Sequence, residues 1–226
     1  STVDAVMKKF DRESNTRVWT GKPKLVIDII LAAFSLWCTY VTLFATFLEE
    51  IRLSSFLGLI ILMGFLIYPA KKGNIRENYI PWYDILFMAG GLFSYFYFVF
   101  NAQQIIDQGT RFECYQIVIG IIGVLALIEV TRRCVGLPIL IVAGFFLIYA
   151  LSYGLTNPDF FGRVKYLVRN LFYTKEGIFS TPVSVCSKFI VVFIIFGAFL
   201  ERTGISSFFI QLANCVAGRY AGGPAK

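Results

Sequence analysis

The chain has 226 residues, of which 57% are hydrophobic, 17% aromatic and only 15% charged, and its formal net charge is +7. This composition excludes an ordinary soluble domain, in which about a quarter of the residues are charged, and predicts an all-α, polytopic helical membrane protein. There is no histidine, and the five cysteines show no metal-ligand spacing, so zinc, haem and histidine-based catalysis lose their usual ligands.

The basic residues do not form a nucleic-acid-binding patch. They lie between long apolar runs, as the lysines and arginines of cytoplasmic loops do in membrane proteins. We therefore expect membrane lipid and no nucleic acid among the partners.

The first part of the chain is a polar arm followed by two spans. Residues 1–24 are basic, contain no cleavable signal peptide and are predicted to be cytoplasmic. Apolar runs then predict membrane-spanning helices over residues 25–48 and 53–68, joined by a short acidic turn outside. A basic loop over residues 71–76 returns to the side of the arm.

The next three spans are predicted over residues 84–100, 115–130 and 137–155. Trp82 precedes the first of these, at the depth where an amphipathic ring suits the membrane interface. The polar stretch 101–113 is predicted to lie outside.

Arg132 and Arg133 separate the fourth and fifth spans. In hydrocarbon each arginine would cost roughly 2.5–3.5 kcal/mol, so the pair predicts a tight turn on one membrane face. With the N-terminus inside, this turn is cytoplasmic, and that side then holds most of the lysines and arginines.

The last third of the chain contains one amphipathic helix and one more span. Apolar residues recur at helical spacing over residues 160–172, with basic residues on the other side, which predicts a helix lying flat on the outer membrane surface. The sixth span is predicted over residues 183–200. Residues 206–217 form an amphipathic piece that is too short to cross.

Ionisable residues near the ends of spans are interpreted as solvated or salt-bridged helix termini, because no acidic residue lies at mid-membrane to form a proton relay or an ion site. Glu129 is expected to pair with one of the arginines that follow it, and Glu201 with Arg202. Topological or structural roles, and no catalytic role, are predicted for Trp82, Asp84, Glu129, Arg132, Arg133, Glu201 and Arg202.

Small residues are predicted to serve packing. Gly120 and Gly123 have the spacing that permits close approach of helices. The cysteines are interpreted as small apolar core residues. Cys114 and Cys186 both fall outside in the predicted topology, so a disulfide between them remains an alternative.

Several strings along the chain are familiar in combination. They are IPWYD at residues 80–84, EVTRRCVGLP at 129–138, YTKEGIFSTP at 173–182, FGAFLERTG at 196–204 and GGPAK at 222–226. Together they resemble the fused permease of TRAP (tripartite ATP-independent periplasmic) transporters, of the kind served by TAXI-type solute-binding proteins. The resemblance extends over nearly all the chain from about residue 20.

The resemblance implies a component of a secondary active transporter of the inner membrane. Such transporters take up organic acids by an elevator-type movement, driven by a sodium or proton gradient, with an extracytoplasmic solute-binding protein that delivers the substrate. It also implies a division into a cytoplasmic arm (1–24), a four-helix scaffold like the small subunit (25–136), a linking span with a periplasmic interfacial helix (137–182) and the start of the large transport subunit (183–226).

Relatives of this family continue past the GGPAK string into hairpins that hold substrate and ions. We therefore assign no substrate, metal or cofactor residue here, expect the coupling ion, Na⁺, to bind in a C-terminal portion, and interpret the chain as the N-terminal part of a transporter, whether a fragment or a truncated gene product. The alternatives are a stand-alone membrane interaction or assembly protein and a polytopic membrane enzyme. The enzyme is disfavoured because the acidic residues are scattered over both membrane faces.

Overall fold

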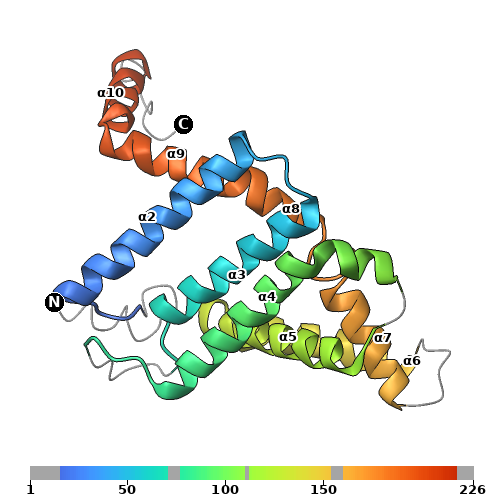
Figure 1. The fold of residues 1–226 in the computed structure, drawn as a ribbon. Coiled ribbons are helices and arrows are strands. Elements are labelled where there is room, and N and C mark those ends of the chain that lie inside the picture. Colours follow the sequence, from blue (N-terminus) through green and yellow to red (C-terminus); the bar gives the residue numbers. More distant parts are fainter. Residues whose placement is uncertain (1–15, 71–76, 110–111, 154–159, 218–226) are drawn as a thin grey trace.

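The computed structural model describes residues 16–70, 77–109, 112–153 and 160–217, which form helices and connecting segments without a β-strand. Figure 1 shows helices that run back and forth between two ends of a bundle. The described helices are α2 (Lys22–Leu43), α3 (Glu49–Ile67), α4 (Trp82–Gln108), α5 (Cys114–Cys134), α6 (Leu137–Tyr153), α7 (Phe160–Phe172), α8 (Thr181–Val185), the π-helical segment η1 (Cys186–Ile190), α9 (Val191–Arg202) and α10 (Ile205–Ala217).

Five of these helical segments in the described part are long and apolar enough to cross a membrane: α2, α3, α4, α5 and the continuous α8–η1–α9 segment. The expectation of an all-α polytopic membrane protein is thus confirmed. α6, which corresponds to the fifth predicted span, is apolar but has 17 residues in the described part, at the lower limit of about 17 for a spanning helix. The end of its predicted span, beyond Tyr153, lies outside the described residues.

The core is formed by α3, α4 and α5, with large side chains interdigitating around small ones. Ile61 and Tyr95 are fully buried. Gly91 permits the close approach, because a Cβ atom built there would lie 2.9 Å from both Ile61 and Ala126. Small residues at such contacts are typical of helices that associate within lipid, where van der Waals packing replaces the hydrophobic driving force.

α7 packs against α5 by its apolar side. This contact requires the small residues at two positions that were predicted to permit close packing, Gly120 and Gly123. A Cβ atom on Gly120 would lie 2.7 Å from Val168, and one on Gly123 would overlap the ring of Phe172. The helix boundaries agree with the predicted amphipathic helix. The expectation that it only lies on the membrane surface is incomplete, since Phe172 is fully buried in the core.

Several helix ends differ from the predictions. α2 ends at Leu43 rather than at residue 48, and α3 begins at Glu49 rather than at residue 53, so the acidic residues of the predicted turn belong to α3. α4 continues through residues 101–108, which were predicted as a polar stretch outside, because Ala102 and Ile105 keep the helix packed at 1% and 2% exposure. At about 1.5 Å per residue, the 27-residue helix is longer than the roughly 30 Å thickness of the hydrocarbon layer of a membrane. Its polar last turns can therefore project beyond that layer.

α5 is also longer than predicted, and Arg132 and Arg133 lie in its last turn rather than in a tight turn between spans. The turn comes after them, where Gly136 has a φ of 109° and its N–H donates to the carbonyl of Thr131 at 3.1 Å. A glycine with positive φ directly after a helix is a common C-terminal stop.

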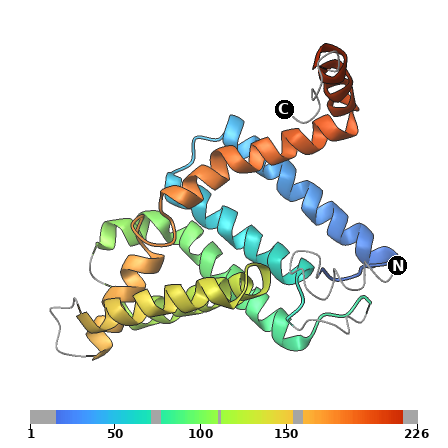
Figure 2. The ribbon, with the colours of Figure 1, turned by 180° about the vertical axis from the view of Figure 1, so that it is seen from behind.

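In the α8–η1–α9 segment, α8 and η1 contact α3, while η1 and α9 contact α2 (Figure 2). α10 follows at the far end of this segment. Most side chains of α9 and α10 are exposed in the described part of the chain. Within the described residues, α9 packs against α2 and α10 packs only against α9.

Candidate functional site

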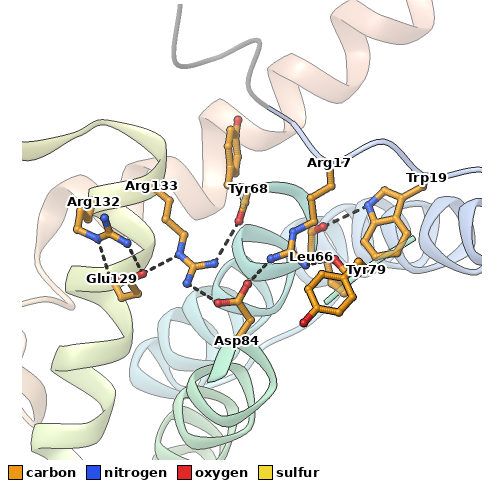
Figure 3. Close-up of polar contacts among 9 residues, drawn as sticks. All are labelled: Arg17, Trp19, Leu66, Tyr68, Tyr79, Asp84, Glu129, Arg132 and Arg133. Carbon is orange, nitrogen blue, oxygen red and sulfur yellow. Dashed lines mark hydrogen bonds and ion pairs between the residues drawn. The ribbon is translucent and has the colours of Figure 1, made fainter. Parts of the chain in front are cut away.

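The most concentrated set of charged side chains lies at the end of the bundle where α3 and α5 finish and α4 begins. We call Arg17, Asp84, Glu129, Arg132 and Arg133 the charge cluster (Figure 3). They come from the segment before α2, the first turn of α4 and the last two turns of α5.

Asp84 is the centre of the charge cluster. It lies in the first turn of α4, where the helix dipole favours a negative charge, and its side chain is fully buried. One carboxylate oxygen accepts a hydrogen bond from Nη2 of Arg133 at 2.6 Å, and the other pairs with Nη2 of Arg17. These two ion pairs offset part of the loss of hydration that burial imposes on the carboxylate.

Arg133 uses each of its guanidinium nitrogens. Besides Asp84, it donates from Nε to Glu129 at 2.9 Å and from Nη1 to the carbonyl of Tyr68 at 3.2 Å. Its guanidinium carbon lies 4.6 Å from the ring centre of Phe65, and its side chain is 1% exposed. This arginine therefore joins the ends of α3, α4 and α5.

Arg17 fastens the N-terminal segment to the same place. Its Nη1 donates to the carbonyl of Tyr79 at 3.2 Å, and its backbone N–H donates to Ile67 at 2.8 Å. The indole N–H of Trp19 donates to the carbonyl of Leu66 at 3.2 Å. These bonds fix the segment before α2 against the open end of α3, whose last carbonyl groups lack helical partners.

Arg132 differs from its neighbour. It forms a two-point ion pair with Glu129 at 2.8 and 2.7 Å, and its side chain is 40% exposed. The expected pairing of Glu129 with a following arginine is therefore present, and Glu129 accepts from both.

The charge cluster is suited to connect structural elements. Both carboxylates are paired with arginines, and arginine does not release a proton at accessible pH. Within the described ranges, no group of three or more His, Cys, Asp or Glu side chains could hold a metal ion. The charge cluster can join three helix ends and a terminal segment, but it offers no open position for a reacting group.

A second polar network joins elements at the opposite end. Glu49 accepts hydrogen bonds from Ser184 at 2.7 Å, Arg52 at 3.2 Å and Lys188 at 3.5 Å. Lys175 pairs with Glu50 at 2.9 Å, and this hydrogen bond is the main reason that the pKa of Lys175 is raised. The network connects the start of α3 with α8, η1 and the segment after α7.

The remaining residues singled out from the sequence lie apart. Trp82 is 75% exposed at the start of α4, as an interfacial anchor would be. Glu201 and Arg202 end α9, both exposed, and in the part of the chain that the structure describes they form no ion pair with each other. Cys114 and Cys186 are both free.

The sequence did not indicate the contacts of Arg17 or the second polar network. Arg17 was grouped with the other basic residues of the arm, although its position between the arm and the first span, beside Trp19, is a weak signal of an anchored segment. Ser184 and Glu49 carry no local signal of their contact, because 135 residues separate them.

The fold and the charge cluster define a multi-pass α-helical membrane protein whose helix ends are joined by buried ion pairs. Residues 122–226 match the family described as tripartite ATP-independent periplasmic transporter, DctM component. This match supports a membrane component of a TRAP transporter, a family of transporters rather than enzymes, and a place in the inner membrane. The match begins within α5, N-terminal to the predicted start of the large subunit at residue 183. The chain matches no curated protein and no solved structure.

Proposed function

We propose that the chain is the scaffold part of a TRAP-type permease that takes up organic acids. The match over residues 122–226 is the observation that carries this proposal. The transporter would work with a TAXI-type solute-binding protein outside the cell and be driven by a sodium gradient.

The packing supports a scaffold role for α3, α4 and α5. These helices share a buried core, ion pairs join the start of α4 to the end of α5, and ion pairs at the start of α3 join it to the segment after α7. The carboxylates of the charge cluster are already paired with arginines, with which a cation would have to compete, so substrate and ion sites are better sought elsewhere in the transporter.

The N-terminus is proposed to be cytoplasmic. In that orientation the charge cluster lies at the cytoplasmic interface, and the network of Glu49 and Lys175 lies outside. Most lysines and arginines of the chain then fall on the cytoplasmic side.

Uptake in cells tests the assignment. Cells without the gene should lose uptake of a labelled organic acid, and a plasmid copy should restore it only when the solute-binding protein is present. Unchanged uptake in the deletion strain, over a panel of organic acids, would refute the proposal.

The scaffold role has a separate readout. Asp84→Asn should lower the amount of folded transporter in the membrane and therefore the maximal uptake rate, with the KM for the organic acid unchanged. A shift of KM by tenfold or more, about 1.4 kcal/mol, would place Asp84 in the substrate path and contradict the scaffold assignment.

A further inference from the structure

A cavity of about 380 Å³ lies between the end of α2, the start of α3 and the η1–α9 segment. One part of its wall is cationic, with Arg52 and Lys188, and another is apolar, with Phe189, Val192 and Phe193. No acidic residue lines it. We propose that this cavity binds the phosphate group and upper acyl chain of an anionic phospholipid.

The order of polar and apolar groups along the span fits a lipid. Arg52 lies three residues after the start of α3, so it is about 4.5 Å from that helix end. Val192 and Phe193 follow Lys188 by about one turn, towards the interior of the span. The cations thus lie at the depth of a headgroup and the rings at the depth of an acyl chain. A small soluble anion would contact the cations but would gain nothing from the apolar wall.

The local charge favours an anion. Arg52 and Lys188 share the single carboxylate of Glu49, at 3.2 and 3.5 Å, and Lys175 also approaches it at 3.8 Å. Glu50 is paired with Lys175. Three cations and two carboxylates leave one positive charge beside the cavity.

An unused donor and a local distortion point to the same place. The Nε atom of Arg52 is buried and has no hydrogen-bond partner, and an N–H in this position costs free energy until an acceptor reaches it. Lys188 lies in the π-helical segment η1, and short π-helical segments occur frequently at functional sites. A phosphate oxygen would satisfy the Arg52 donor and pair with Lys188.

The aromatic side chains of the apolar wall are exposed on the outer surface of the helical segment. Phe189 and Phe193 are 56% and 71% exposed, on a segment long and apolar enough to span the membrane. A lipid can therefore enter sideways from the membrane, with its acyl chain along these rings.

Native mass spectrometry of the chain in detergent micelles, with added phosphatidylglycerol or phosphatidylcholine, tests the proposal. The wild type should retain one phosphatidylglycerol in preference to phosphatidylcholine. The variant Arg52→Gln/Lys188→Gln should bind it at least about tenfold more weakly, because loss of even one of the two charge-assisted bonds is expected to cost that factor. Val192→Trp should weaken binding comparably, because it fills the cavity and leaves the charges in place.

Lys22→Gln/Lys24→Gln is the matched control, since it removes two exposed basic residues at the other end of α2. It should bind phosphatidylglycerol as the wild type does. Equal loss in this control would show general charge attraction and overturn the proposal. Displacement of the lipid by soluble glycerol phosphate would indicate a site for a small anion and also overturn it, as would a wild type that retains no lipid.

Circular dichroism and size-exclusion profiles that match the wild type must accompany each variant. The charge variant removes the cations, whereas Val192→Trp fills the cavity. If either variant is folded and still binds the lipid as the wild type does, the proposed site is refuted.

Discussion

Removal of the Asp84 carboxylate should strongly destabilise the protein. The side chains of Asp84, Arg133 and Arg17 are 0%, 1% and 4% exposed, so Asp84→Ala leaves two guanidinium groups in a place that water does not reach. Loss of one partner from a buried ion pair costs about 3–5 kcal/mol. Arg133 would still hold Glu129, whereas Arg17 would lose the only carboxylate that it contacts among the described residues, so the value should lie within that range.

Asp84→Asn should cost less, about 1.5–3 kcal/mol, because the amide keeps one acceptor oxygen for one arginine. The difference between the two variants separates the loss of charge from the loss of all contact. A double-mutant cycle with Arg17→Ala should give a coupling free energy of about 0.5–3 kcal/mol, since the two side chains are in direct contact.

The assay is unfolding of the purified chain by titration with sodium dodecyl sulfate from a mild detergent, followed by circular dichroism. Glu201→Ala is the matched control, because Glu201 is an exposed acidic residue at a helix end. Its free energy of unfolding should stay within about 0.5 kcal/mol of the wild type. If Asp84→Ala also stays within that limit, the buried ion pairs of Asp84 do not stabilise the folded protein.

Three further variants test other contacts by the same unfolding assay. Gly123→Ala should cost about 1–3 kcal/mol by overpacking against α7, while Gly144→Ala, with open space around its Cα, should be neutral or slightly stabilising; equal effects would contradict the packing account. Tyr95→Phe should leave stability unchanged or raise it by about 1 kcal/mol, because the hydroxyl is buried without a hydrogen-bond partner, and a loss of more than about 1 kcal/mol would show a hidden one. The hydrogen bond to Glu50 raises the pKa of Lys175 in the folded protein. The Lys175–Glu50 ion pair therefore stabilises the folded state fully below the pKa that Lys175 has in the unfolded chain, and this stabilisation is lost as pH rises through the pKa of Lys175 in the folded protein. The stability difference between wild type and Lys175→Met should therefore shrink in strongly alkaline buffer, and a constant difference would contradict the ion pair.

The sequence predicts the helices well because each span must be a long apolar run and each gap must be polar. The ion pairs that follow from local spacing were also predictable: Glu129 reaches Arg132 and Arg133 across one helical turn. Helix ends were less predictable. α4 and α5 both run beyond their apolar stretches, because a helix can continue through polar residues wherever neighbouring side chains cover part of it.

The long-range contacts of the charge cluster could not be predicted from the sequence. Asp84 is 67 residues from Arg17 and 49 residues from Arg133 in the chain, and no periodicity relates them. Each looks like an ordinary charge near a span end, and only the packing of α3, α4 and α5 brings the three together. The same holds for α7, whose amphipathic pattern fits a membrane surface as well as it fits the glycine-lined side of α5.

The central claim, a membrane component of an ATP-independent transporter, is tested most directly by uptake in energy-depleted cells. The initial rate of labelled organic acid uptake should be measured in a deletion strain carrying the gene on a plasmid, with ATP exhausted and a sodium gradient imposed. Uptake should persist without ATP, stop when the gradient is collapsed and be absent without the plasmid. Uptake that requires ATP, or that proceeds equally without this chain, would rule out such a transporter.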